Sequence, residues 1–370
     1  PDLLRFGPHF PHSNPLGDRP SKAGDLWINS ANEDQFIPGT GPVYGHTSWN
    51  TYLHELGHAL GLRHPNEAPN DDSTSAQYTV MSYVEHPSES GEQLSTQAYS
   101  LTPMVWDIQA AQQLYGANTT TRTGNNVYFG DGNGQGEQAY QYGANNMMVR
   151  GEDNRDRPVI LAIWDAGGTD LIDASDLSTN SRIDLTPGTY STIGSIENNV
   201  GLAAAVMQNG QTINFIENAW GGSGNDQLGG NAANNELRGN DGADTLTGGD
   251  GDDTLTGGAG DDQLDGGAGS RDQAAFDINR ADATITVNGN TITVASSEGT
   301  DILTGIEFLA FADQVVDASN PNGGGGSTTP TQGNDVLTGT EAADQRGALG
   351  GDDSVSGLGG NDTLYGGPGN

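Results

Sequence analysis

Three histidines and one glutamate in the stretch TYLHELGHALGLRHP have the types and spacing that metal chemistry needs. His54 and His58 stand four residues apart, so on a helix both side chains lie on one face and can bind the same ion. Glu55 lies beside them without being a ligand, while Gly61 lets the chain leave the helix in a left-handed turn that brings in His64. Three neutral imidazoles leave one coordination position for water, as in a catalytic rather than a structural zinc site.

The complete pattern H-E-x-x-H-x-x-G-x-x-H is far more specific than H-E-x-x-H alone and is typical of metzincin metalloproteases. Such enzymes also place a methionine turn under the metal, and the segment TVMSYVE, residues 79–85, supplies one with Met81. The alternatives are a coincidence of three histidines or a metal clip without catalysis. Glu55 and the downstream methionine favour the metalloprotease.

These residues need regular elements to position them. Apolar residues recur at helical spacing over Thr47–Gly61, which predicts a helix that carries both of the paired histidines. The segment GDLWINS, residues 24–30, predicts a strand. A second helix is predicted within 101–118, with Thr102 as its N-cap and Pro103 at its first position.

Charge and composition separate two chemistries along the 370-residue chain. Lys plus Arg number 13 against 49 for Asp plus Glu, so the formal net charge is −36 and divalent cations are the expected counterions. Nucleic-acid and anionic-membrane partners are not expected, because phosphate groups attract the opposite charge. All seven histidines precede residue 87, whereas glycine and aspartate accumulate after residue 220. There is no cysteine, and no apolar run approaches the roughly 18 residues of a membrane span.

Residues 221–274 and 333–370 repeat with a period of nine, as in GGDGDDTLT and GGAGDDQLD. The period matches the calcium-binding nonapeptide G-G-x-G-x-D-x-U-x of RTX proteins. Glycines permit tight turns and leave carbonyl oxygens open to a cation, and each aspartate adds the hard oxygen ligand that Ca²⁺ prefers. The regular leucines point inward, so stacked turns bury one apolar column and form a parallel β-roll. A disordered Gly- and Asp-rich segment, the alternative, does not explain those leucines.

The predicted calcium ligands of the repeats are glycine carbonyls and aspartate carboxylates. They are Gly222, Gly224, Asp226, Gly239, Asp241, Asp244, Gly248, Asp250, Asp253, Gly257, Gly258, Gly260, Asp262, Asp335, Asp344, Asp353 and Asp362. Asn235 replaces an aspartate and weakens one calcium turn, while Arg346 stands at an inward leucine position and marks an end turn or a defect. Without calcium the crowded carboxylates repel one another, and we expect the region to unfold.

Other segments predict strands and a linker. Short β-type runs such as VILAIW and IDLT alternate with turns from 117 to 220, and residues 275–317 return to strands with Asn-Gly as a hairpin signal. The segment PNGGGGSTTPTQ has the composition of a flexible linker. The expected division is a catalytic domain in 1–117, a β-sandwich and β-roll calcium domain in 118–274, a strand extension in 275–320, the linker 321–332 and a second repeat block in 333–370.

Pro65 after the third histidine and Tyr83 after the turn methionine accompany the two motifs. With them, and with the segments GDLWINS, LYGANTTTRTG, WDAGGTDLID and IENAWGGSGND, the chain closely resembles the serralysins, secreted RTX metzincin proteases of Gram-negative bacteria. The resemblance covers nearly all of the chain up to about residue 265. It implies an α+β metzincin catalytic domain, with its N-terminal part outside this sequence, followed by an all-β calcium-binding parallel β-roll.

The resemblance also implies roles for individual residues. The implied zinc ligands are His54, His58, His64 and, as a displaceable ligand, Tyr83. Glu55 is the implied general base, Tyr83 donates a hydrogen bond to the oxyanion, and strand 24–30 pairs with an extended peptide substrate. The calcium ligands implied outside the repeats are Arg122, Gly124, Asn126, Asp165, Gly167, Gly168, Asp170 and Glu217. The alternative for WDAGGTD is a plain turn between strands.

For the whole protein we expect a secreted, extracellular monomer that uses zinc and several calcium ions and leaves the cell through a type I channel. Its expected partners are protein and peptide substrates and a proteinaceous protease inhibitor, without membrane insertion. The competing class is a calcium-binding RTX adhesin or surface protein with an inactive protease domain. Histidines without ligand spacing are expected at the surface or in loops, and most tryptophans in the core; these are His9, His12, His46 and His86, and Trp49, Trp106 and Trp164.

Overall fold

We analysed a computed structural model of the chain. It describes residues 47–65, 74–84, 86–87, 99–130, 137–141, 148–150, 156–194, 196–319 and 321, with short strands at 4–6, 26–28, 336–338, 345–347, 354–356 and 363–365. The chain divides into two compact units, residues 1–216 and 217–370, which we describe separately. Among the described residues no helix has the length and apolar character to cross a membrane.

The first unit combines two helices with short strands. Its elements are β1 (Leu4–Phe6), β2 (Leu26–Ile28), α1 (Thr47–Ala59), β3 (Tyr99–Ser100), α2 (Val105–Tyr115), β4 (Asn126–Phe129), β5 (Glu137–Gln141), β6 (Met148–Arg150), β7 (Asp156–Ile163), β8 (Leu171–Asp173), β9 (Arg182–Asp184), β10 (Tyr190–Ser191), β11 (Val200–Leu202), β12 (Met207–Gln208) and β13 (Gln211–Thr212). Strand β7 lies between β11 and β3 and also pairs with β6, while β4 runs parallel to both β5 and β8. The predicted strand 24–30 is confirmed as β2, which pairs antiparallel with β1.

Helix α2 begins later than the sequence predicted. The predicted N-cap was Thr102, yet the helix starts at Val105 with Met104 in the capping position. The hydroxyl of Thr102 instead accepts a hydrogen bond from the amide of Ala162 at 2.7 Å and lies 3.1 Å from the carbonyl oxygen of the same residue. Thr102 therefore fastens the segment before α2 to strand β7, and this competing contact explains the error.

The second unit contains the repeats. Its elements are β14 (Asn218–Trp220), β15 (Gln227–Gly229), β16 (Glu236–Asp241), β17 (Thr245–Asp250), β18 (Thr254–Ala259), β19 (Gln263–Ala268), β20 (Gln273–Phe276), the 3₁₀ turn η4 (Arg280–Asp282), β21 (Thr284–Asn288), β22 (Thr291–Ala295), β23 (Thr300–Thr304), β24 (Phe308–Phe311), β25 (Val315–Asp317), β26 (Val336–Thr338), β27 (Gln345–Gly347), β28 (Ser354–Ser356) and β29 (Thr363–Tyr365).

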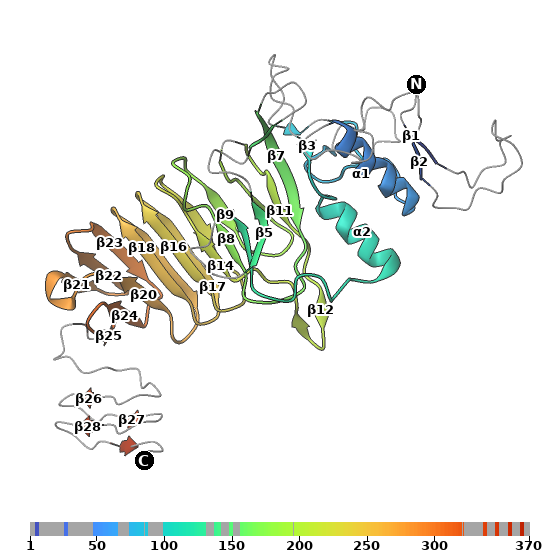
Figure 1. Ribbon diagram of the computed structural model, residues 1–370. Helices are drawn as coiled ribbons and strands as arrows, with labels where there is room; N and C mark the ends of the chain where they lie inside the picture. The colour runs from blue at the N-terminus through green and yellow to red at the C-terminus, as the bar shows by residue number, and fades with distance from the viewer. Residues whose placement is uncertain are drawn as a thin grey trace, which may run out of the picture. The chain divides into compact units, whose positions relative to one another are not determined.

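Successive repeats alternate between two parallel sheets, so that strands 18 residues apart become neighbours. One sheet contains β14, β16, β18, β20 and β24, and the other contains β15, β17, β19 and β23. Figure 1 shows β16, β18 and β20 side by side. The repeat leucines pair in register, for example Leu237 with Leu255 and Leu246 with Leu264, and each of these four is at most 1% exposed. The predicted inward column of leucines is therefore confirmed.

Residues 275–317 form strands, as predicted. Strands β21 and β22 make an antiparallel hairpin in which Asn288 pairs with Thr291, so the two-residue loop contains Gly289 of the Asn-Gly signal. In the second repeat block, β26 pairs with β28 and β27 with β29, both parallel and both with an offset of 18 residues. Arg346 is in register with Leu364, which is the leucine position that the sequence assigned to it.

Candidate metal centres

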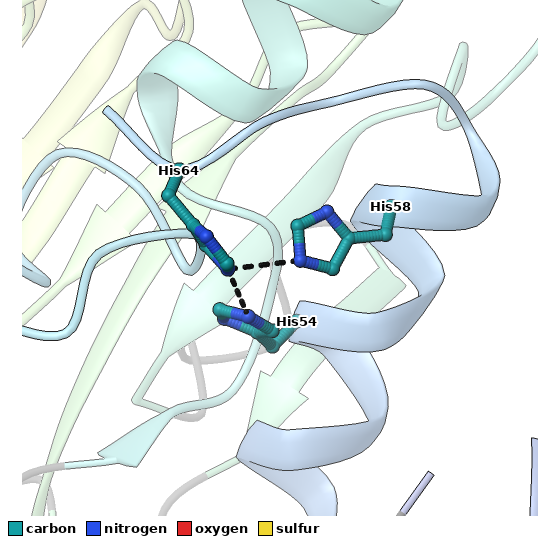
Figure 2. A group of neighbouring side chains, drawn as sticks. All are labelled: His54, His58 and His64. Atoms are coloured by element: carbon teal, nitrogen blue, oxygen red, sulfur yellow. Dashed lines mark hydrogen bonds between the residues drawn. The ribbon is translucent and has the colours of Figure 1, made fainter. Parts of the chain in front are cut away.

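Helix α1 and the turn after it bring the three histidines together. His54 and His58 lie on successive turns of α1, and Gly61, with a φ of +94°, ends the helix in the left-handed region as predicted. Figure 2 shows the three rings converging, with the Nε2 atom of His64 3.0 Å from that of His54 and 2.9 Å from that of His58. They form a group of metal-ligating side chains whose donor atoms lie within 4.8 Å of one another.

The Nδ1 hydrogen bonds of His54 and His58 determine which ring nitrogen carries the proton. Nδ1 of His54 donates to the carbonyl oxygen of Val80 at 2.7 Å, and Nδ1 of His58 donates to that of Leu62 at 2.9 Å. With the proton on Nδ1, each Nε2 atom presents a lone pair toward His64, whose single ring proton can serve only one of the two contacts. Converging lone pairs without enough protons are the donor set of a metal cation, and three imidazoles fit zinc.

The environment keeps His54 in the neutral form that a metal requires. Burial lowers the pKa of His54, the hydrogen bond to Val80 opposes this change, and the charges of His58 and His64 lower the pKa further. The side chain is only 8% exposed. A neutral imidazole is therefore available for coordination without first losing a proton.

The methionine turn packs directly beneath the histidine helix. Met81 is 1% exposed and belongs to an apolar cluster with Leu53, Val80 and Met104. A Cβ atom at Gly57, between the two helical histidines, would collide with the sulfur of Met81. Glycine at this position thus allows the close approach of α1 and the turn, which places the thioether under the site as the sequence predicted.

A buried carboxylate holds the methionine turn and was not identified from the sequence. Asp107 in the first turn of α2 is 4% exposed. Its carboxylate accepts hydrogen bonds from the hydroxyl of Thr79 at 2.5 Å and from the amides of Val80 and Met104 at 2.8 and 2.9 Å. Burial raises the pKa of Asp107, and these three donors oppose the rise. Because the carbonyl of Val80 accepts from His54, Asp107 supports a histidine that it does not touch.

Tyr83 and Glu55 both occur near the histidines. The ring centroid of Tyr83 lies 4.6 Å from that of His64 and 5.2 Å from that of His54, and the side chain is 75% exposed. Glu55 follows His54 on α1 and is half-buried. The structure therefore brings Tyr83 to the three histidines, and Glu55 is the residue after His54 on the helix.

Two aromatic side chains differ in burial from what the sequence indicated. His86 was expected at the surface or in a loop; it lies outside the helices and strands but not at the surface, because it is 2% exposed, and burial lowers its pKa. Trp106 was expected in the core, but 45% of it is exposed, and it stacks on Tyr78. Both depend on contacts between distant segments, which residue spacing does not reveal.

The repeat turns of the second unit form two ladders of carboxylates. The amide of Asp226 donates to Oδ1 of Asp244 at 2.7 Å, and the amide of Asp244 donates to Oδ1 of Asp262 at 2.8 Å. In the other ladder the amide of Asp253 donates to Oδ1 of Asp272 at 2.9 Å. Each backbone amide thus positions the aspartate of the turn 18 or 19 residues later.

The second oxygen of these aspartates is the evidence for a cation. The Oδ2 atoms of Asp244, Asp253, Asp262 and Asp272 are buried and have no hydrogen-bond partner. Burial, reinforced by neighbouring carboxylates, raises the pKa of Asp244 to about 7 and that of Asp253 to about 6. Buried oxygens that no donor satisfies are costly, and calcium fits them because it accepts carboxylate and carbonyl ligands.

In the second ladder, Asn235 places a neutral carboxamide where the repeat has an aspartate. Its Oδ1 accepts from the amide of Asn231 at 2.7 Å, in the way that Oδ2 of Asp226 accepts from Gly222. Its Nδ2 donates to the carbonyl oxygen of Glu217 at 2.8 Å. A donor at this position offers a cation one oxygen fewer, which gives a physical reason for the predicted weaker turn.

The first unit contains a pair of turns built in the same way outside the repeats. The amide of Asn126 donates to Oδ1 of Asp170 at 2.8 Å, as Asp226 does to Asp244 in the roll. Gly168 has a φ of +147°, and a Cβ atom there would collide with the carbonyl oxygen of Gly124. These turns hold the predicted non-repeat calcium ligands Arg122, Gly124, Asn126, Asp165, Gly167, Gly168 and Asp170.

Asp165 and Asn126 bring oxygens close together in these turns. Asp165 accepts from the hydroxyl of Tyr128 at 2.6 Å and from the amide of Gly167 at 3.0 Å. One amide atom of Asn126 lies 3.1 Å from the carbonyl oxygen of Gly124 and 3.2 Å from Oδ2 of Asp165. A nitrogen there hydrogen-bonds to both oxygens, whereas an oxygen there completes a set that a cation holds together.

Some predicted ligands are not placed by these observations. Glu217 begins the second unit, whereas its predicted companions belong to the first. Asp335, Asp344, Asp353 and Asp362 lie outside the described residues, as do His9, His12 and His46. Their roles stay predictions.

Comparison with known proteins identifies a family for the part of the chain that follows the histidine centre. Residues 117–302, half of the chain, match the family model described as Peptidase M10 serralysin C terminal, and residues 348–370 match the RTX calcium-binding nonapeptide repeat. Among solved structures, the extracellular lipase LipA from Serratia marcescens aligns with 45% of this chain and 27% of its own at 20% identity. The TM-score of this alignment is 0.21.

Curated relatives agree with the family models. Serralysin C from Dickeya chrysanthemi is 41% identical, with 56% of this chain and 40% of the relative covered. Serralysin from Proteus mirabilis is 36% identical, with 56% of this chain and 40% of the relative covered. Metalloprotease AprA from Pseudomonas entomophila is 38% identical, with 57% of this chain and 42% of the relative covered. The chain thus spans about two fifths of the length of these relatives. With half of its residues matched by the family model, the chain belongs to the family of the M10 peptidase serralysin C-terminal domain, and it carries RTX calcium-binding repeats.

Proposed function

We propose that the chain is part of a secreted zinc-dependent endopeptidase that hydrolyses extracellular proteins and is stabilised by calcium in its β-roll. The observation that carries the proposal is the convergence of three Nε2 atoms, two of them from the helix that also carries Glu55 and the third from the turn after it. The metalloprotease names of the relatives support it. The α+β metzincin catalytic domain, the domain limits given above, type I export, the monomeric state and the inhibitor partner belong to the same proposal.

Each residue of the centre has a task in peptide hydrolysis. His54, His58 and His64 hold zinc, with Tyr83 as a displaceable fourth protein ligand. When bound, zinc supplies Lewis-acid activation of water and of the substrate carbonyl. The carboxylate of Glu55 takes the proton from the attacking water and returns it to the nitrogen of the leaving amine. The hydroxyl of Tyr83 donates a hydrogen bond to the oxyanion, and strand β2 pairs with the extended substrate.

A Glu55→Ala comparison on casein, with zinc and calcium supplied, tests the proposal. We expect the unaltered chain to cleave casein and Glu55→Ala to lose at least about a hundredfold in rate, because general-base catalysis contributes about 10²–10⁴. Glu236→Ala is the matched control, because Glu236 pairs with Arg238 on the surface of the other unit. Zinc content should be equal in all three proteins. Equal rates, or equal silence, of the unaltered chain and Glu55→Ala would refute the enzyme proposal and favour an inactive, calcium-binding RTX surface protein.

A further inference from the structure

Residues 296–301 follow the hairpin strand β22 and include the first two residues of β23. They lie outside the nine-residue repeats, yet they form a turn with the geometry of a repeat turn. Gly299 has a φ of +153°, close to the +143° of Gly260 in the repeat turn 257–262. A Cβ atom at Gly299 would collide with the carbonyl oxygen of Gly260, as one at Gly260 would with that of Gly242. The turn 296–301 therefore stacks on turn 257–262 in the way that repeat turns stack on one another.

The hydrogen bonds between the two turns repeat the ladder of the roll. The amide of Asp262 donates to Oδ1 of Asp301 at 3.1 Å, as the amide of Asp244 donates to Oδ1 of Asp262 at 2.8 Å. The amide of Gly260 donates to the carbonyl oxygen of Glu298 at 2.8 Å. Asp301 thus occupies the position of a repeat aspartate, and Glu298 that of the third residue of the motif.

The strand after this turn continues the apolar column. Leu303 pairs with Leu264 in the parallel sheet and is 0% exposed. The amide of Thr300 donates to Oδ1 of Asp261 at 2.8 Å, which adds a further contact between the turns. The segment G-T-D-I-L, residues 299–303, is therefore the second half of a nonapeptide whose first glycines are missing.

The space between these turns has the chemistry of a cation site. Asp262 is 1% exposed and its Oδ2 atom has no hydrogen-bond partner, and Asp301 is 2% exposed. Burial, together with the charges of Asp262, Asp261 and Glu298, raises the pKa of Asp301 to about 7, although the hydrogen bond from the amide of Asp262 lowers it. Carboxylates this close and this buried are stable in ionised form only beside a positive charge.

We propose that turn 296–301 completes a calcium site with turn 257–262, in which Asp262, Asp301 and carbonyl oxygens of both turns are the ligands. The site rests on the proposal that the repeat turns bind calcium, and it extends that binding one turn beyond the last repeat of this ladder. The hairpin β21–β22 immediately precedes the turn, so calcium binding also orders the strand extension.

Calcium stoichiometry of the full chain tests the site. Asp301→Asn removes the charge but keeps an oxygen that accepts from the amide of Asp262, so the turn can still form. The matched control is Asp282→Asn, because Asp282 is exposed in η4, next to the same hairpin. Native mass spectrometry during calcium titration should show that Asp301→Asn loses one calcium ion, or needs at least about tenfold more calcium for it. Asp282→Asn should match the unaltered chain. Equal calcium binding by Asp301→Asn and the unaltered chain would overturn the inference.

Crystals of the unaltered chain grown with calcium give a test that does not depend on a variant. We expect anomalous density about 2.3–2.6 Å from carboxylate oxygens of both Asp262 and Asp301. Density in the turn pair of Asp226 and Asp244 but none beside Asp301 rejects this site and leaves the calcium-binding repeats intact. Density at neither place overturns the calcium proposal itself, and with it this inference.

Discussion

Replacing Asp107 by alanine should weaken both the fold of the first unit and its affinity for zinc. The carboxylate accepts hydrogen bonds from the hydroxyl of Thr79 and from the amides of Val80 and Met104, and all of these residues are at most 4% exposed. A buried donor without a partner costs about 1–3 kcal/mol. Part of this loss is offset, because the variant no longer buries a carboxylate whose pKa is raised by burial. We therefore expect the free energy of unfolding to fall by about 3–5 kcal/mol.

The affinity for zinc should also fall, because the methionine turn that Asp107 holds also orients His54. The carbonyl oxygen of Val80 accepts from Nδ1 of His54 at 2.7 Å, and Val80 is fixed by Asp107 through its amide. Loss of an outer partner of a metal ligand typically lowers metal affinity by 10- to 100-fold. Asp107→Asn should lose less, because both amides bind one oxygen, Oδ2, which the carboxamide can retain.

Denaturant unfolding and competition with a zinc chelator dye measure the two effects separately. Asn199→Ala is the matched control. The buried side chain of Asn199 hydrogen-bonds to the amide and to the carbonyl oxygen of Ile193, and these bonds involve neither the methionine turn nor the histidines. It should lower stability and leave zinc affinity unchanged. If Asp107→Ala also leaves zinc affinity unchanged, the support of His54 through Val80 is refuted.

Two further predictions concern the β-roll. Leu255→Ala should lower the free energy of unfolding of the calcium-loaded roll by about 2–5 kcal/mol, because Leu255 is 0% exposed; an equal loss in Val287→Ala, at a side chain that is 42% exposed, would contradict the role of the column. In EDTA the roll should become more stable on acidification, because the pKa of Asp244 is raised from 3.8 to about 7 and the folded state binds more protons between these values. This stabilisation is complete below 3.8 and lost as the pH rises through about 7; far-UV circular dichroism that is flat across this window would contradict it.

Periodic and local patterns predicted much of the fold. The helical spacing of apolar residues over 47–61 and the glycine at 61 predicted helix α1 and its end, because helix geometry and the left-handed turn depend on neighbouring residues. The nine-residue period predicted the parallel β-roll, because each repeat must bury its leucine against the next coil. Leu237 pairs with Leu255 at an offset of two such periods.

Contacts between distant segments were not predictable in this way. Asp107 binds a turn 27 residues earlier, and Thr102 binds a strand 60 residues later. A short polar residue before an apolar run predicts a helix cap whether or not its side chain has a partner in a distant segment. Only the tertiary contact determines which role Thr102 takes. The turn 296–301 carries the half-motif G-x-D-x-U, which lacks the first glycines of the complete nonapeptide.

That half-motif explains why the roll needs the strands that follow it. Each repeat aspartate positions its carboxylate on the amide of an earlier turn, so the last turn of each ladder requires an acceptor that no further repeat supplies. The amide of Asp262 finds it in Asp301, and the amide of Asp272 finds it in Glu307 at 2.9 Å. Both acceptors belong to the extension after the repeats. The extension therefore ends both ladders with the same chemistry that builds them, and its carboxylates are needed for the last repeats to keep their geometry.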